Sequence, residues 1–378
     1  MAKRTLAVGM IGDGLMAKEH SMAWRNVQAV YGDVPVEPRL VVLVHPDADR
    51  AQSAAERYGF ERFATSWREV IDDPTIDVID IVTPNAFHGE VAIAAAAAGK
   101  HLWCEKPLGL GAEEALRMTE AAESAGVRTM VGFTYLHNPG LQLAKKLIDG
   151  GELGELFSFT AFFGADTMID PAVSFTWRTD RARAGGGALG DLGSHLVSIA
   201  RMLVGDISRV NGMTRIVVPE RKDTGGMLHA VDNDDHAFAM VEFANGVTGS
   251  LQASRVQTGR AFEVSFAITG TAGAIRFSQQ DSYRLEVSLA SDGLDTHGFR
   301  TIELGPGHGD FGQLWPMSGI NIGLHELKIF ELRRLIDGIV DGHRVLPDFR
   351  EGWEIEKVIE AIERSAASRC WEDVSQYA

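Results

Sequence analysis

The chain has 378 residues, 45% of them hydrophobic and 23% charged, which is typical of a globular protein and too long for a single hydrophobic core. Its 36 basic and 52 acidic residues give a formal net charge of −16, which argues against nucleic acid or an anionic membrane as a partner. The two cysteines indicate a reducing compartment, and we recognise neither a secretory leader nor an apolar run of about 18 residues, so we expect a cytoplasmic protein.

The first apolar run, residues 6–11, predicts a buried parallel strand that leads directly into a glycine pattern. The pattern reads G-x-G-x-x-A and consists of Gly12-Asp13-Gly14-Leu15-Met16-Ala17. Its first glycine suits a tight turn, its second lets the backbone approach a pyrophosphate, and its small last residue lets a helix pack closely on the strand. A helix-like stretch over residues 15–30 follows, so the sequence predicts a dinucleotide site with the phosphates at a helix N-terminus.

The second predicted strand, residues 40–44, bears on the choice between NAD and NADP. In NAD-binding units of this type an acid usually ends the strand and holds the adenosine ribose. His45 stands there instead, and we interpret Asp47 as the N-cap of a helix over residues 48–58. Because no arginine follows His45 directly to bind a ribose phosphate, we expect NAD, with NADP as the open alternative.

Two further predicted strands, residues 76–82 and 101–104, each end in a polar segment that contains proline: Thr83-Pro84-Asn85 and Glu105-Lys106-Pro107. Helices predicted over residues 87–98 and 112–125 alternate with the strands, which favours a parallel, doubly wound Rossmann sheet whose strand ends line a ligand crevice. Lys106 would then point into the crevice, although this stretch alone favours a surface lysine in a turn.

A glycine run at residues 185–187 opens another helical pattern, which carries Asp191 and His195 four residues apart. That spacing places both side chains on one helix face. A carboxylate beside an imidazole orients the ring and stabilises its charged form, as a proton-transferring histidine requires. A capped helix with a purely structural histidine is the alternative interpretation.

The pattern changes after Tyr135, where consecutive strand-like runs with short turns predict a large, open, mostly antiparallel sheet in an α+β domain. The Asn245-Gly246 pair between two alternating runs predicts a hairpin. Residues 236–244 are apolar on both faces, which favours a homo-oligomer, with a sheet covered by its own helices as the alternative. We therefore expect three parts: a Rossmann domain at 1–134, a substrate-binding and oligomerisation domain at 135–349, and a C-terminal helix at 350–378 that packs on the first domain.

One grouping of residues suggests metal ligands: His229 and His236, with three aspartates (Asp232, Asp234 and Asp235) between them. The ligand spacing is not that of a typical zinc site. We interpret these residues as a solvated acidic loop before a strand and expect no metal.

The motifs at 12–17, at 83–85 with His88, at 105–107 and at 191–195 occur in this order along the chain. Together they resemble the glucose–fructose oxidoreductase / inositol dehydrogenase family, also written Gfo/Idh/MocA, over nearly the whole chain. The segments Phe175-Thr176-Trp177-Arg178, 186–191 and 200–205 are similar to the branch of the family that oxidises glycosides and anhydrosugars.

The resemblance implies an NAD(P)-dependent oxidoreductase that moves a hydride from a secondary ring hydroxyl, expected at C3, of a sugar, glycoside or anhydrosugar to the nicotinamide. By family pattern Lys106 hydrogen-bonds the reacting hydroxyl, His195 has the acid/base role and Asp191 is its carboxylate partner. The family leaves open whether Lys106 or His195 takes the proton, and we expect His195. The expected cofactor contacts are Gly12, Asp13, Gly14, Leu15, Met16, His45, Thr83, Pro84, Asn85, His88, Glu105 and Lys106. The expected substrate contacts are Lys106, Tyr135, Trp177, Arg178, Asp191, His195 and His325. The family also implies a homodimer or homotetramer formed through the C-terminal sheet.

Two positions depart from the family pattern. Ser198 stands three residues after His195, where many members carry aspartate, and His45 replaces the ribose-binding acid. Four alternatives stay open: an inositol or cyclic polyol dehydrogenase, an enzyme that cycles a tightly held cofactor between two sugars, a lyase-like enzyme that oxidises a ring carbon transiently, and a non-catalytic dinucleotide sensor. The presence of Lys106, Asp191 and His195 together argues against the sensor.

Overall fold

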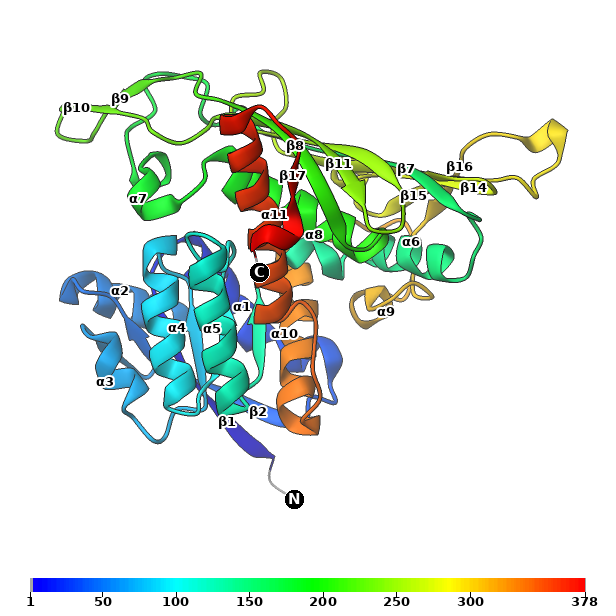
Figure 1. The fold of residues 1–378 in the computed structure, drawn as a ribbon. Helices are drawn as coiled ribbons and strands as arrows, with labels where there is room; N and C mark the ends of the chain where they lie inside the picture. The colour runs from blue at the N-terminus through cyan, green and yellow to red at the C-terminus, as the bar shows by residue number, and fades with distance from the viewer. Residues whose placement is uncertain (1–2, 378) are drawn as a thin grey trace. The chain divides into compact units, whose positions relative to one another are not determined.

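The computed structural model describes residues 3–377, which form two compact units (Figure 1). The first unit contains the described residues up to 134 together with 324–354, and the second contains 135–323 together with the described residues from 355 onward. Within the described chain, no helix combines the length and apolar character needed to cross a membrane.

The first unit is built on a six-stranded sheet in the order β3-β2-β1-β4-β5-β6, and the neighbouring strands pair in parallel. The strands are β1 (Arg4–Ile11), β2 (Val36–Val44), β3 (Arg62–Ala64), β4 (Val78–Ile81), β5 (His101–Cys104) and β6 (Thr129–Val131). The predicted doubly wound Rossmann sheet is confirmed. The strand order reverses between β1 and β4, so a ligand crevice is expected at the carboxyl ends of these two strands.

Six helices belong to the first unit: α1 (Leu15–Tyr31), α2 (Ala48–Tyr58), α3 (Trp67–Ile71), α4 (His88–Ala97), α5 (Ala112–Ala125) and α10 (Leu324–Asp341). The apolar side of α10 joins Leu6, Val8 and Met10 of β1 in one buried core. Residues 324–349 therefore fold with the first unit, whereas we expected them in the second domain.

The second unit contains a nine-stranded sheet in the order β16-β15-β14-β13-β7-β12-β11-β8-β17. Its strands are β7 (Leu156–Gly164), β8 (Ile207–Arg215), β11 (His236–Phe243), β12 (Thr248–Ser254), β13 (Glu263–Gly270), β14 (Gly273–Ser278), β15 (Arg284–Leu289), β16 (Arg300–Glu303) and β17 (Glu372–Asp373). The β7–β12 pair is parallel and the other described pairs are antiparallel, as the sequence predicts for most of the sheet. The expected hairpin joins β11 and β12 at Gly246, whose φ is +87°.

The helices of the second unit are α6 (Pro139–Asp149), α7 (Arg181–Ala184), α8 (Ser194–Leu203), α9 (Phe311–Leu314) and most of α11 (Phe349–Ser368). Alternate residues of β7, namely Phe159, Ala161 and Phe163, are buried on the helix-covered side of the sheet. From Ile355 onward the C-terminal segment belongs to the second unit, and β17 pairs with β8. We expected all of residues 350–378 to pack on the first domain. The part from Ile355 onward instead belongs to the second unit, where β17 adds a strand to the large sheet.

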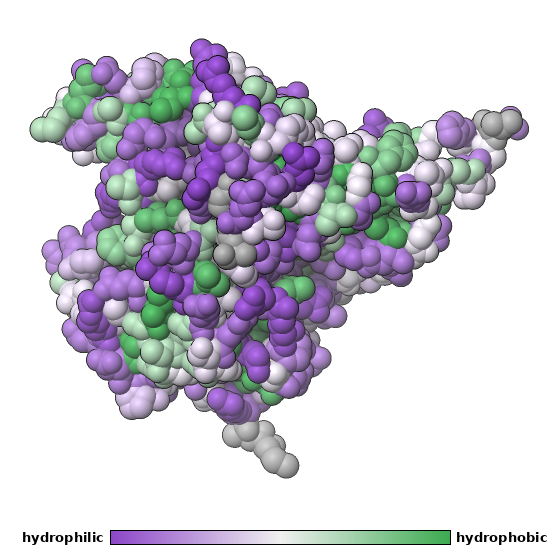
Figure 2. Space-filling view, in the orientation of Figure 1, coloured by the Kyte–Doolittle hydropathy of each residue, from purple (hydrophilic) through white to green (hydrophobic). Residues whose placement is uncertain are grey.

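A separate ribbon of two short strands, β9 (Glu220–Lys222) and β10 (Leu228–Ala230), extends from the second unit. Met227 and Leu228 are 66% and 54% exposed on it. Figure 2 shows hydrophobic side chains gathered near this ribbon and over part of the large sheet on the face in view.

Candidate active-site residues

The glycine loop of the first unit fits a bound pyrophosphate. Gly12 has φ +121°, and a Cβ atom there would lie 2.6 Å from the carbonyl oxygen of Val82, so a side chain is excluded. Gly14 is the N-cap of α1 and offers no side chain to the N–H groups of the first turn, at Leu15 and Met16. These N–H groups are consequently available to an anion, as a dinucleotide site requires.

The end of β2 carries His45 and Asp47. Asp47 is the N-cap of α2, as predicted, and its Oδ1 accepts a hydrogen bond from the backbone N–H of Arg50 at 3.1 Å. The backbone N–H of Asp47 donates to His45 Nδ1 at 3.0 Å. The Arg50 guanidinium donates two hydrogen bonds of 2.9 Å to the carboxylate of Asp13 in the glycine loop.

The loop after β4 carries Thr83, Pro84 and Asn85 at the predicted strand end. It is tied to the loop after β5 by His88, whose Nδ1 lies 2.9 Å from the Pro107 carbonyl oxygen and whose Nε2 lies 3.1 Å from that of Thr83. Burial lowers the pKa of His88, although both carbonyl oxygens favour the charged ring. His88 is fully buried, so we expect it to support the cofactor loops from behind rather than to contact the cofactor.

Glu105 and Lys106 follow β5 directly. Glu105 Oε1 accepts from Lys328 Nζ at 2.6 Å and from His20 Nε2 at 2.9 Å, and its Oε2 accepts from the backbone N–H of Lys106 at 3.2 Å. Burial opposes the ionised form, but the charge of Lys328 and these hydrogen bonds outweigh it and hold the pKa of Glu105 well below its usual range. The carboxylate thus anchors the backbone from which the candidate catalytic lysine extends.

The anchor belongs to a fully buried group of charges. His20 Nδ1 lies 2.7 Å from Asp80 Oδ1, so both ring nitrogens face carboxylates, and the ring stacks on Trp103 with centroids 3.8 Å apart. Burial alone would lower the pKa of His20, but the charge of Asp80 and the hydrogen bonds to Asp80 and Glu105 raise it. Lys328 also lies 3.4 Å from Glu331, which accepts from Trp103 Nε1 at 2.6 Å.

Sequence analysis missed this group of charges. Asp80 interrupts an otherwise apolar predicted strand, and Lys328 and Glu331 stand three apart on the side of α10 that is buried. Buried charges at such positions are rarely tolerated without partners. This was the signal that could have revealed them.

In the second unit, Asp191 lies in a π-helical turn, Leu189–Gly193, which continues into α8 with His195 in its first turn. The predicted helix is present, with a wider turn of the kind that often occurs at functional sites. The His195 ring packs edge-on against Tyr135 at 4.8 Å between centroids and lies 5.9 Å from Phe163. Ser198, which departs from the family pattern, donates its Oγ hydrogen to the His195 carbonyl oxygen at 2.8 Å.

Tyr135, Asp191 and His195 therefore gather in one unit. Burial, and then the charge of Asp191, raise the pKa of Tyr135. The phenol consequently stays protonated at neutral pH and is no candidate for the base. Lys106 lies in the first unit, and so does His325, whose Nε2 is 3.2 Å from Asn26 Nδ2.

The acidic segment before β11 holds the glycine run. Asp234 Oδ1 and Oδ2 accept from the backbone N–H groups of Gly187 and Leu189, each at 2.8 Å. Asp234 is 6% exposed and Asp235 is fully buried, so the interpretation of a solvated acidic loop was wrong: these carboxylates bind backbone amides that the charge pattern alone does not reveal. Among residues 3–377, no group of three potential metal ligands occurs.

Trp177 and Arg178 lie in a short 3₁₀ helix, Trp177–Thr179, with the guanidinium 4.5 Å from the centre of the Trp177 ring. The buried Arg255 holds this segment by donating to the Arg178 carbonyl oxygen at 3.0 Å. Arg255 Nε also donates to Asp235 Oδ1 at 2.8 Å. The two candidate substrate contacts are thus fixed through their backbone.

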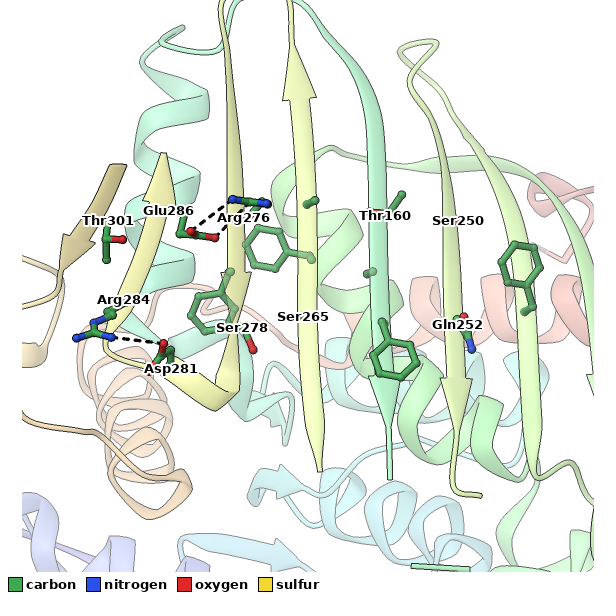
Figure 3. A pocket seen from close by; sticks show the side chains of 16 residues that line it. Thr160, Ser250, Gln252, Ser265, Arg276, Ser278, Asp281, Arg284, Glu286 and Thr301 are labelled. Atoms are coloured by element: carbon green, nitrogen blue, oxygen red, sulfur yellow. Dashed lines mark hydrogen bonds and ion pairs between the residues drawn. The ribbon is translucent and has the colours of Figure 1, made fainter. Parts of the chain in front are cut away.

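A hollow of about 500 Å³ lies on the open face of the large sheet (Figure 3). It is lined by aromatic rings and by polar side chains, among them the Arg276–Glu286 and Arg284–Asp281 ion pairs. Phe162 of β7 lines the hollow, whereas its neighbour Phe163 contacts His195. Because successive residues of a strand face opposite sides, the hollow lies across the sheet from His195. We therefore do not regard it as the active site.

Comparison with known families identifies the class. Residues 6–133 match the oxidoreductase family with an NAD-binding Rossmann fold, and residues 141–276 match the GFO/IDH/MocA C-terminal domain. The chain belongs to the Gfo/Idh/MocA oxidoreductase family, which confirms the resemblance carried by the four motifs.

Within this family the chain is similar to levoglucosan dehydrogenase of Pseudarthrobacter phenanthrenivorans, with 40% identity over 386 aligned positions that cover 99% of both chains. A solved structure of levoglucosan dehydrogenase in complex with NADH and levoglucosan matches with a TM-score of 0.96 at 40% identity, covering 98% of this chain and 100% of the other. The scyllo-inositol 2-dehydrogenase (NAD(+)) of Bacillus subtilis is 32% identical over 238 positions, 63% of this chain and 65% of that protein. The similarity to the anhydrosugar-oxidising branch is thereby confirmed.

Proposed function

We propose that the protein is an NAD-dependent dehydrogenase that oxidises a secondary ring hydroxyl, at C3, of an anhydrosugar or glycoside. One observation carries the proposal: the similarity to levoglucosan dehydrogenase extends over 99% of both chains, so neither the cofactor unit nor the substrate unit is missing. The inositol dehydrogenase matches over a smaller share of this chain and is the less favoured relative.

The first unit fits NAD. The glycine loop at Gly12 excludes side chains, and the first turn of α1 presents N–H groups to the pyrophosphate. When bound, the nicotinamide supplies the hydride acceptor. The residues expected around the whole dinucleotide are those of the loops after β1, β2, β4 and β5.

The chain's own residues would handle the proton. His195 accepts it from the substrate hydroxyl, and the negative charge of Asp191, one turn earlier in the same helical segment, stabilises the resulting imidazolium. The Lys106 ammonium donates a hydrogen bond to the hydroxyl oxygen and favours the alkoxide that develops there. Trp177 offers an apolar ring face to the sugar, and Arg178, Tyr135 and His325 complete the proposed substrate contacts.

The proposal extends to assembly and location. A homodimer or homotetramer formed through the open face of the large sheet is supported by its exposed apolar side chains, such as Met213 and Met240, which are 58% and 43% exposed. A cytoplasmic location is supported by the two free cysteines.

The test is a substrate panel with the purified protein. We would follow reduced cofactor by absorbance with NAD or NADP and with levoglucosan, a methyl glucoside, an aryl glucoside, glucose, myo-inositol and scyllo-inositol. The expected result is NADH formed in equal amount to a keto-sugar from levoglucosan or a glucoside. Turnover of inositols alone would favour the polyol dehydrogenase, and dinucleotide binding without turnover of any compound would favour the sensor.

A further inference from the structure

The end of β2 lacks the acid that usually binds the adenosine ribose, yet a carboxylate stands beside it. Asp13 Oδ1 lies 3.8 Å from His45 Nε2, and His45 is the residue that follows β2. The Asp47 N–H donates to His45 Nδ1 at 3.0 Å, so the other ring nitrogen, Nε2, is the one that faces Asp13. A carboxylate from the glycine loop thus reaches the place where the β2 acid is expected.

The carboxylate is held in place. Arg50 donates to it through Nε and Nη2, each at 2.9 Å, in a bidentate pair, and the Tyr58 hydroxyl donates to the Asp13 backbone carbonyl at 3.3 Å. The Asp13 side chain is 14% exposed, whereas that of Arg50 is 60% exposed. Arg50 therefore covers Asp13 from the solvent side.

Arg50 is a residue that could bind a ribose 2′-phosphate, but its guanidinium is already paired with Asp13. A cavity of about 320 Å³ beside the glycine loop has four charged lining residues, two of each sign: Asp13, Asp49, Arg50 and Arg57. A phosphate dianion placed here would meet no net positive charge, and it would have to displace Asp13 from Arg50.

We propose that Asp13, paired with Arg50, sets the preference of this enzyme for NAD over NADP. Asp13 replaces the missing β2 acid as the acceptor for the ribose hydroxyls, repels a 2′-phosphate and occupies the guanidinium that would otherwise bind it. This inference rests on the proposed function, since it concerns the dinucleotide of the same site.

The test is calorimetric titration of the full-length protein with NAD and NADP, without substrate. For the wild type we expect tighter binding of NAD. In Asp13→Asn and in Asp13→Ser the ratio of the two dissociation constants, NADP over NAD, should fall by about 10- to 100-fold, because a charged repulsion is lost and Arg50 becomes available. Adding Arg50→Gln to Asp13→Asn should remove most of the gain in NADP affinity.

Asp47→Asn is the matched control. It removes the same charge from a neighbouring loop position, and asparagine still caps α2. The ratio should then stay within about threefold of the wild type, since Asp47 faces the helix amides. Thermal unfolding of each variant checks that it is folded.

Three results would overturn the inference: equal affinity of the wild type for both dinucleotides, an unchanged ratio in both Asp13 variants, or an equal change in Asp47→Asn. Failure of the wild type to bind either dinucleotide would instead contradict the proposed function.

Discussion

Lys328 Nζ lies 2.6 Å from Glu105 Oε1 in the core of the first unit, although the two residues are 223 positions apart in the chain. The same carboxylate accepts the backbone N–H of Lys106. Helix α10 thereby supports the loop that carries the candidate catalytic lysine. A segment that follows residues 135–323 of the second unit in sequence thus completes the first unit.

Replacing Lys328 with methionine should lower the free energy of unfolding by about 3–5 kcal/mol, because the Glu105 carboxylate stays buried without its cation. Urea unfolding measures the change. Arg39→Gln serves as the control, since the Arg39–Glu61 pair is exposed and should contribute about 1 kcal/mol or less. If Lys328→Met cost no more than this control, the buried pair would not be stabilising in the way we describe.

The His20 imidazolium should make stability depend on pH. The pKa of His20 is raised in the folded protein, so its contribution is fully present below the ordinary value of 6.5 and is lost as pH rises through the raised value. The difference in unfolding free energy between wild type and His20→Gln should therefore shrink above about pH 6.5, by up to about 1.4 kcal/mol per pH unit. Urea unfolding between pH 6 and 9 tests this, and a constant difference would contradict it.

The parallel sheet and the glycine loop could be predicted because their signals are local. Residues 6–11 form a short apolar run, and the glycines follow within the same stretch, so neighbouring residues alone indicate the strand and the turn. Asp13 and His45 were expected near the cofactor for the same reason. The hydrogen bonds from Arg50 to Asp13 were not predicted, since they depend on how α2 packs beside the glycine loop.

The buried charges could not be predicted because their partners arrive from distant segments. Asp80 in a strand and Lys328 in a helix look unrelated until the fold places both around His20 and Glu105. The prediction for Asp234 was wrong for a related reason. A run of acidic residues resembles a solvated loop when the backbone amides that the carboxylates bind are remote in sequence.

Gly187 should be far less replaceable than Gly190, three residues further along. A Cβ atom on Gly187 would lie 1.8 Å from the Asp234 carbonyl oxygen, so the backbone must move and its bonds to Asp234 are lost. We expect Gly187→Ala to cost about 3 kcal/mol or more of unfolding free energy. A Cβ atom on Gly190 meets no described atom within 4 Å, so Gly190→Ala should stay within about 1 kcal/mol. Urea unfolding measures both variants. Similar losses of unfolding free energy in the two would contradict the close approach of Gly187 to Asp234.

Arg255→Met should raise KM for the sugar more than it lowers kcat. The arginine fixes the Arg178 backbone, and its loss leaves Trp177 and Arg178 less ordered without touching the proton-transfer residues. Steady-state kinetics with the substrate found in the panel measures both constants. Arg260→Gln, at an exposed pair with Glu263, is the control and should leave both unchanged.

His195→Asn should lower kcat by about 10²- to 10⁴-fold while the affinity for NAD stays unchanged, because the proposed base is lost but the dinucleotide is held by the other unit. Ser198→Ala is the matched control on the same helix: it removes only the bond to the His195 carbonyl oxygen, so kcat should change by less than about fivefold. Tyr135→Phe removes a phenol that is already protonated and should leave the shape of the pH–rate profile unchanged. Near-normal turnover in His195→Asn would assign the proton to another group, and Lys106→Met would then be the next variant to measure.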